Sequence, residues 1–113
     1  MVKIEAMIRP QRIEEVQQAL HELGLAGLTV TEVRGMGRQR GATHTYRGSQ
    51  YTLNLTPKSK IEIVVPTEMA DQVVAAIREA AVTGEVGDGK IFVIPVSEAV
   101  RIRTDERGEA ALS

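Results

Sequence analysis

A glycine-rich segment ending in a lysine is the first group of residues whose types could do chemistry. Residues 83–90 read TGEVGDGK, so Gly84, Gly87 and Gly89 precede Lys90. Glycines let backbone N–H groups turn toward an anion, and a lysine adds a positive charge, so the segment could bind a phosphate. An Asp-Gly pair before a strand is also an ordinary turn. The segment is not a Walker loop, because the spacing differs and no Ser or Thr follows Lys90.

Two arginines near the C-terminus form the second group. Arg101 and Arg103 are two residues apart on a strand expected at 100–103, so their side chains should share a face. Two guanidinium groups on one face could bind a phosphate or carboxylate in bidentate fashion. The alternative is a charged edge strand that prevents aggregation.

The middle of the chain is basic and contains no acid. Between Glu32 and Glu62 the charged residues are Arg34, Arg38, Arg40, Arg47, Lys58 and Lys60. The whole chain has a net charge of −1, so this segregation favours an anionic ligand or an acidic partner. A merely solvated basic loop is the alternative.

Single residues give weaker indications. Gln39 could ligate a metal through its carbonyl oxygen, and Lys58 could pair with a carboxylate. Tyr51 lies in a polar loop, where it serves local packing or exposes its hydroxyl to a modifying enzyme. His21 should be partly exposed on a helix and His44 lies in the loop, and neither has a partner set that predicts a catalytic triad.

Length and composition limit the function classes. The chain has 113 residues, enough for a single core and one domain spanning 1–113. It has no Cys, which excludes disulfides and thiolate metal sites, and two His, which cannot alone make a zinc site. No apolar run approaches the roughly 20 residues of a membrane span, and the N-terminus begins as an alternating strand rather than a signal peptide. A cytoplasmic protein is the default expectation.

The first half of the chain predicts a strand, a helix and a strand. Residues 3–9 alternate in polarity, as in a half-buried strand that Pro10 ends. Helical spacing then relates the apolar residues Ile13, Val16, Leu20 and Leu23. Gly24 is the expected C-cap, and the β-branched residues of 28–34 predict the second strand.

The second half repeats this order. Residues 61–65 predict a strand, and a helix follows with Thr67 as its N-cap. The apolar residues of that helix are Met69, Val73, Ile77 and Ala80. Residues 91–96 predict the last strand of the plan. The fold class is therefore α+β, a ferredoxin-like split βαβ arrangement with an antiparallel sheet and both helices on one face. Residues 36–57 form a long loop without clear periodicity between strands 2 and 3, and 100–103 adds a short C-terminal strand.

With these segments placed, the chain resembles the PII signal-transduction family, collinearly from residue 1 to about residue 104. Three stretches and a short C-terminal motif carry the resemblance: VTEVRGMGRQRG at 30–41, YRGSQY at 46–51, TGEVGDGKIFVIPV at 83–96, and RIRT at 101–104. The resemblance implies a ferredoxin-like homotrimer that is a regulatory sensor and not an enzyme.

The resemblance also implies a set of ligand residues. ATP or ADP would bind in clefts between subunits, with Thr29, Glu62 and Val64 around the adenosine and with Gly37, Arg38, Gln39, Gly87, Gly89 and Lys90 around the phosphates. Arg101 and Arg103 would reach in from the neighbouring subunit. With Mg-ATP present, Gln39 would ligate Mg²⁺, and 2-oxoglutarate would bind through Gln39, the backbone around Gly41, and Lys58.

The long loop, residues 37–56, would carry the output of this sensor. We expect it to be mobile without ligand and to control nitrogen-metabolism partners such as an ammonium transporter or a nitrogen-assimilation enzyme. Arg47 would insert into the partner, and Ser49 or Tyr51 would be the modified residue. No nucleic acid is expected, and a membrane only through a transporter partner. Several positions, most of them in or beside this loop, differ from the usual family pattern: Gln11, Met36, Ala42, His44, Gln50, Asn54, Leu55 and Thr56.

Three other functions fit a chain of this size and plan. An acylphosphatase needs an arginine closing a glycine-rich loop, but Gly24 and Gly27 are followed at that spacing by Thr31. An RNA-binding module needs aromatic residues on the sheet, and Phe92 is the only strand aromatic expected. A PII paralogue that senses nucleotide with a different small ligand, or serves a non-nitrogen partner, is the remaining alternative.

Overall fold

The structure is a computed structural model that describes residues 1–36, 43–46, 49–52 and 55–113, with only the backbone described for 43–46 and 49–52. Its first half forms β1 (Val2–Ile8), the short 3₁₀ turn η1 (Pro10–Arg12), α1 (Ile13–Glu22) and β2 (Thr29–Met36). Gly24 follows α1 with φ at +81°, and its N–H donates to the carbonyl of His21 at 2.9 Å. This left-handed residue ends the helix as expected.

The second half forms β5 (Leu55–Val65), the 3₁₀ turn η2 (Thr67–Met69), α2 (Ala70–Ala81) and β6 (Lys90–Pro95). The predicted N-cap at Thr67 is wrong. Pro66 and Met69 precede η2 and α2, and the Thr67 hydroxyl instead accepts a hydrogen bond from the Met1 amine at 3.1 Å. The 3₁₀ turn begins at Thr67 itself, one residue before a helix capped by Thr67 would begin.

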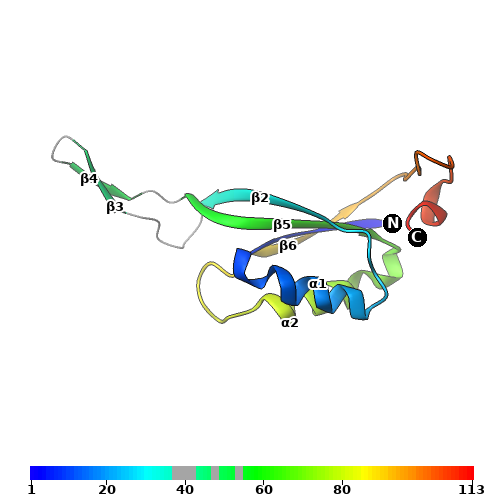
Figure 1. Cartoon of the computed structure of the whole chain (residues 1–113), viewed down its shortest axis with the longest axis horizontal. Helices are drawn as coiled ribbons and strands as arrows, with labels where there is room; N and C mark the ends of the chain where they lie inside the picture. The colour runs from blue at the N-terminus through cyan, green and yellow to red at the C-terminus, as the bar shows by residue number, and fades with distance from the viewer. Residues whose placement is uncertain (37–42, 47–48, 53–54) are drawn as a thin grey trace.

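The four long strands form one antiparallel sheet in the order β2-β5-β1-β6. Each strand–helix–strand unit therefore inserts one strand of the other unit between its own two strands. Both helices cover the same face of the sheet (Figure 1). This arrangement confirms the ferredoxin-like split βαβ plan.

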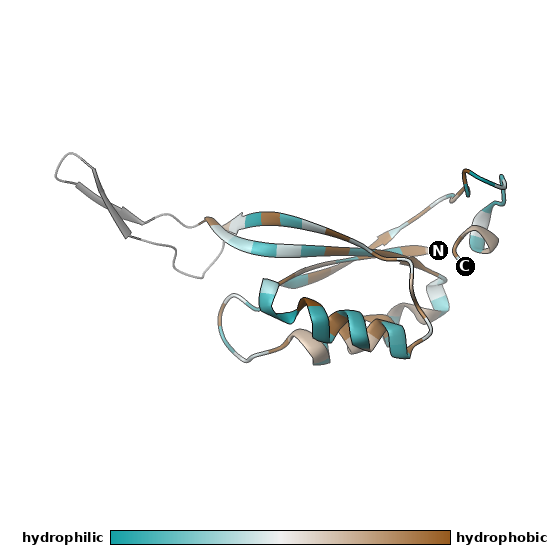
Figure 2. Cartoon of the chain, viewed as in Figure 1, coloured by the Kyte–Doolittle hydropathy of each residue, from teal (hydrophilic) through white to brown (hydrophobic). Residues whose placement is uncertain are grey.

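The core lies between the helices and the covered face of the sheet. Strand alternation buries the even-numbered residues of β1 and the odd-numbered residues of β5 from Ser59 onward, because successive side chains point to opposite faces. The fully buried large side chains are Ile4, Ile8, Val16, Leu20, Ile61, Val65, Val73 and Ile77. Burial of each such side chain stabilises the fold by about 1.5–3 kcal/mol. The outward side of α1 is mostly hydrophilic (Figure 2).

The other face of the sheet, which we call the open face, carries no helix. Strand register places Met7, Val64, Phe92 and Ile94 on it, among charged residues such as Glu62. Phe92 is 47% exposed and Ile94 is 37% exposed. Large apolar side chains on an uncovered sheet face are typical of a surface that another molecule covers.

A long segment joins β2 and β5, as predicted, but it contains two strands that the sequence pattern did not indicate. β2 and β5 pair out to Met36 and Leu55, which makes β5 eleven residues long. Two further strands, β3 (Thr43–Tyr46) and β4 (Ser49–Thr52), pair antiparallel with each other. Threonine and tyrosine favour strands, and this local preference outweighed the lack of apolar alternation. Half of residues 37–56 lie outside the described part, so the expected mobility of this segment stays a prediction.

The predicted strand at 100–103 is also wrong. Val100 makes one isolated bridge to Arg107, and residues 102–104 turn between them. The Arg101 N–H donates to the Glu106 carbonyl at 2.9 Å, and Asp105 adopts a positive φ of 61°. The chain ends in the 3₁₀ turn η3 (Gly108–Ala111). Short polar residues such as Thr104 and Asp105 bond to nearby backbone groups, which favours a turn over an extended strand.

None of the helices in the described ranges has the length and apolar character that crossing a membrane requires.

Candidate functional site

The glycine-rich segment between α2 and β6 forms a tight loop, residues 83–89, which we call the phosphate loop. Gly84, Gly87 and Gly89 all have positive φ, at 91°, 105° and 101°. A Cβ placed on Gly89 would lie 1.7 Å from the carbonyl oxygen of Met7. Only glycine therefore lets the loop lie this close to the backbone of β1.

Asp88 holds the phosphate loop closed. Its Oδ2 accepts hydrogen bonds from the N–H groups of Thr83 and Gly84 at 2.8 and 2.9 Å, and its Oδ1 accepts one from the Thr83 hydroxyl. Arg9 pairs with the same carboxylate, with Nε 3.0 Å from Oδ1. The Thr83 hydroxyl and N–H, together with Arg9, hold the pKa of Asp88 well below its usual range, so the carboxylate is ionised at neutral pH.

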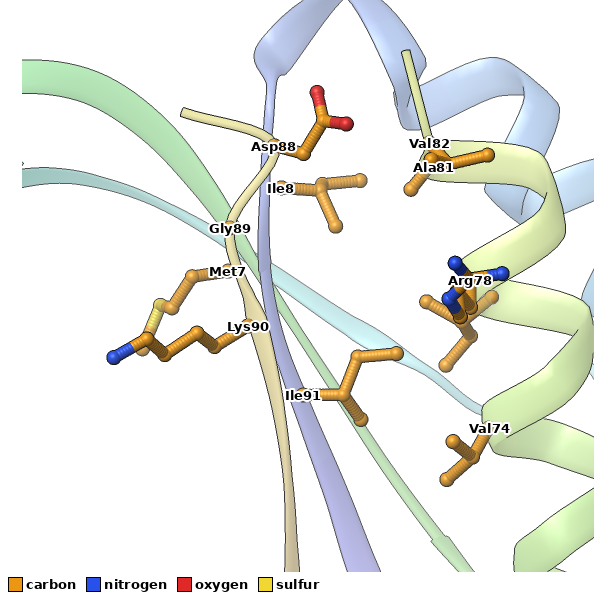
Figure 3. Close-up of a pocket in the computed structure, with 11 residues that line it drawn as sticks. Met7, Ile8, Val74, Arg78, Ala81, Val82, Asp88, Gly89, Lys90 and Ile91 are labelled. Carbon is orange, nitrogen blue, oxygen red and sulfur yellow. The ribbon is translucent and has the colours of Figure 1, made fainter. Parts of the chain in front are cut away.

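Two lysines stand beside the loop. The Lys58 ammonium, on β5, donates a hydrogen bond to the Gly87 carbonyl. Burial lowers the pKa of Lys58, the charge of Arg9 lowers it further, and Asp88 acts in the opposite direction. Lys90 opens β6 opposite Met7, and both side chains point away from α2 (Figure 3). The two ammonium groups thus approach the same side of the loop.

A cavity of about 690 Å³ lies on this side. Its polar wall contains Lys58, Lys90 and the backbone of Gly87 and Gly89, and its apolar wall contains Met7, Met36, Val86 and Phe92. The volume falls in the range of small-molecule sites. Two cations, turned glycine backbone and an apolar wall suit an anion that carries an apolar group.

A second cavity, of about 440 Å³, lies on the helix side of the same strands. Ile8 and Ile91 face it from the sheet and Val74 faces it from α2 (Figure 3). Its wall is mostly apolar, and Lys90 points to the other side of β6. The lysine ammonium groups therefore gather at the first cavity, which both Lys58 and Lys90 line.

The residues expected around the adenosine lie together on the open face. Thr29 pairs directly with Glu62 across β2 and β5, and Val64 follows on the same face. The Glu62 carboxylate accepts a hydrogen bond from the Lys3 ammonium at 2.9 Å, which lowers the pKa of Glu62. Along the strands this group is near Lys90, because Glu62 and Phe92 both pair with Glu5 and Lys90 is two residues, roughly 7 Å, from Phe92 on β6.

The C-terminal segment that contains Arg101 and Arg103, drawn in orange to red, lies near the N-terminus and away from the phosphate loop (Figure 1). The expectation that they share a strand face is wrong, because a turn follows Arg101. Arg101 Nε lies 3.6 Å from Glu106 Oε1, and its Nη2 bonds to the Ala110 and Ser113 carbonyls. Arg103 is exposed in the turn. One chain therefore separates the predicted nucleotide residues into two groups.

Several predicted residues cannot be placed. Gly37, Arg38, Gln39, Gly41 and Arg47 lie outside the described residues. Ser49 and Tyr51 lie on β4, with only their backbone described. Within the described ranges, no group of three or more His, Asp or Glu side chains could hold a metal ion.

The sequence patterns did not indicate the ion pair between Arg9 and Asp88 of the phosphate loop. Alternation placed Arg9 on the polar side at the end of the first strand, without a role. Its partner Asp88 is 79 residues away along the chain, so no local pattern could reveal the pair. The strand pairing of β1 with β6, combined with the turn signal before Lys90, was the available indication that the two are neighbours.

Comparison with known proteins decides the family. A family model described as "Nitrogen regulatory protein P-II" matches residues 1–106. The chain belongs to the PII family. Nitrogen regulatory protein P-II of Rhodospirillum rubrum is 53% identical over 112 residues, which cover 99% of this chain and 100% of the relative. Nitrogen regulatory protein P-II 1 of Escherichia coli strain K12 is 51% identical with the same coverage.

A solved structure agrees with the fold. Arabidopsis thaliana PII bound to citrate superposes with a TM-score of 0.80 at 44% identity, covering 97% of this chain and 90% of that chain. PII proteins are regulatory and not enzymatic, so the acylphosphatase alternative does not apply. The chain is therefore a regulatory, effector-binding protein of this family.

Proposed function

We propose that this PII protein binds ATP and ADP as a sensor of energy state, in one domain spanning 1–113. The cavity beside the phosphate loop is the observation that carries the proposal. Lys58, Lys90 and the backbone of Gly87 and Gly89 line it, next to an apolar wall. Charge-assisted hydrogen bonds from such groups suit a polyphosphate, and the apolar wall suits its nucleoside.

The separation of the predicted residues supports a site shared between subunits. The C-terminal segment, which contains Arg101 and Arg103, lies at one end of the fold, and the phosphate loop with Gly87 and Gly89 lies at the other (Figure 1). Two copies that pack their open faces together, with the two sheets running in opposite directions, would bring opposite ends next to each other. The exposed Phe92 and Ile94 on that face favour such packing, in the homotrimer that we propose.

We further propose that 2-oxoglutarate binds together with Mg-ATP, through Gln39, the backbone around Gly41, and Lys58. The charge of Lys58 and its place beside Gly87 suit a carboxylate ligand. The Arabidopsis relative was solved bound to citrate, which is also an organic polycarboxylate. Gln39 would supply an oxygen ligand to Mg²⁺, whose other ligands would include phosphate oxygens.

The proposed output is control of a nitrogen-metabolism partner in the cytoplasm, such as an ammonium transporter or a nitrogen-assimilation enzyme. Residues 37–56 would contact the partner, with Arg47 inserted into it. Phosphate on Ser49 or a nucleotidyl group on Tyr51 would place bulk and negative charge beside Arg47 and prevent docking. The alternative, a paralogue with another small ligand or a non-nitrogen partner, rests on the altered positions around this segment.

Isothermal titration calorimetry tests the proposal directly. Wild-type protein is titrated with ATP and with ADP in Mg²⁺, each with and without 2-oxoglutarate. We expect both nucleotides to bind, and 2-oxoglutarate to tighten ATP by the factor by which ATP tightens 2-oxoglutarate, as linkage requires. ATP binding without any change by 2-oxoglutarate would favour the paralogue. Absence of nucleotide binding would contradict the proposed function.

A further inference from the structure

Arg9 connects the end of β1 to two points of the phosphate loop. Its Nε donates to Asp88 Oδ1 at 3.0 Å, and its Nη2 donates to the Val86 carbonyl oxygen at 2.9 Å. The side chains of Arg9 and Asp88 are 21% and 22% exposed, so most of the ion pair is covered. A planar guanidinium can bond to both acceptors at once because its donors diverge in fixed directions.

Through Asp88 this connection extends to the start of the loop. The same carboxylate accepts the N–H groups of Thr83 and Gly84, so one side chain joins residues 83–84 to the end of the loop. Gly89 at that end lies directly against the Met7 carbonyl of β1. Arg9 therefore fixes both arms of the loop to a strand in the middle of the sheet.

The ion pair also compensates the negative charge of Asp88. Asp88 is an ionised carboxylate between Gly87 and Gly89, whose backbone lines the basic cavity. An uncompensated negative charge at this position would repel an anionic ligand. Arg9 neutralises it at hydrogen-bond distance. The bond from Arg9 to Val86 also occupies a carbonyl oxygen of the loop, which would otherwise be a further acceptor near the anion.

We propose that Arg9 is a positioning residue of the anion site: it holds the phosphate loop in the conformation that receives an anion, and it cancels the charge of Asp88. The inference rests on the proposed nucleotide binding and adds a residue that acts through the loop without touching the ligand.

The experiment compares three variants with wild type by calorimetry with ATP. Arg9→Met keeps the apolar stem but loses both bonds and the charge. Arg9→Lys keeps the charge and one donor direction. Arg12→Met, in η1, is the matched control that removes an arginine three residues further along. We expect Arg9→Met to weaken ATP about tenfold, the effect of one charge-assisted hydrogen bond. Arg9→Lys should recover part of this loss, and Arg12→Met should stay within twofold of wild type.

A second measurement, by nuclear magnetic resonance, follows the conformation of the phosphate loop in the absence of ligand. In ¹H–¹⁵N spectra the amide signals of Thr83 and Gly84 report their bonds to Asp88. We expect Arg9→Met to move both signals, with the signals of buried α2 residues such as Ile77 unchanged, and Arg12→Met to leave them in place. Unmoved signals would overturn the positioning role whatever the calorimetry gives.

The two proposals fail in different ways. If wild type binds ATP and Arg9→Met binds it equally well, or if Arg12→Met loses as much, Arg9 has no positioning role and the nucleotide proposal stands. If wild type does not bind ATP, the nucleotide proposal falls, and the amide signals alone decide whether Arg9 positions the loop.

Discussion

Asp88 is the side chain whose hydrogen bonds hold the phosphate loop together. Its carboxylate receives hydrogen bonds from Thr83, Gly84 and Arg9. All of these bonds favour the ionised form, so the pKa of Asp88 is lower in the folded protein than in the unfolded chain. A lowered pKa in the folded state links the ionisation of this group to stability.

The sign of this linkage gives a pH prediction. The contribution of Asp88 to stability is complete above its unfolded pKa, near 3.8, and is lost as the pH falls through its lower folded pKa. Asp88→Asn should therefore lower the urea midpoint at pH 7, and the difference from wild type should shrink steadily in the acid range below pH 4. Urea unfolding at a series of pH values measures it. A difference that is the same at pH 7 and at low pH would show that Asp88 is not the linked group.

At the scale of elements, the phosphate loop depends on its close contact with β1. Gly89 has no room for a side chain because the Met7 carbonyl lies in the way, whereas a Cβ on Gly84 would meet nothing within 4 Å. Both residues have positive φ, so both carry a conformational preference for glycine. Comparing the same substitution at Gly84 and at Gly89 therefore separates the cost of backbone strain from the cost of steric contact.

We expect Gly84→Ala to cost about 1–3 kcal/mol of stability from its backbone conformation alone. Gly89→Ala should cost clearly more, since the strand or the loop must also move, and it should weaken ATP as well. Urea denaturation of both variants and calorimetry with ATP measure the two effects. Equal losses of stability in the two variants would contradict the contact with β1.

The elements that the sequence could predict are those with a local pattern. The alternation around Ile4 and Ile63 and the helical spacing around Val16 and Val73 placed the sheet strands, the helices and the core. Patterns of this kind fail where the chain has few apolar residues. β3 and β4 carry no apolar alternation, and the polar run after Val100 turns back on itself.

The candidate site was predictable in part. Glycine spacing indicated the phosphate loop, and Gly84, Gly87 and Gly89 all have positive φ. The pair of Arg9 with Asp88 was not predictable, because it depends on which strands are neighbours in the sheet. The two arginines at 101 and 103 were expected on a strand face, and a turn places them differently.

At the scale of the whole molecule, two groups of proposed nucleotide residues, one in the C-terminal turn and one at the phosphate loop, lie at opposite ends of the fold (Figure 1). Lys90 stands beside the phosphate loop, and Arg103 lies in the C-terminal turn. A site built from both groups requires a second copy. We therefore propose that the nucleotide site is shared between copies of the chain.

Mixing two variants tests this claim most directly. Lys90→Ala removes one half of the site, and Arg103→Ala removes the other; each alone should weaken ATP about ten- to a hundredfold. The two are unfolded together, refolded as a mixture and titrated with ATP. In randomly mixed assemblies about a quarter of the sites combine an intact half from each variant, so we predict that this fraction binds ATP with wild-type affinity. A mixture that binds no better than the two separate variants, despite confirmed exchange of subunits, would contradict a shared site.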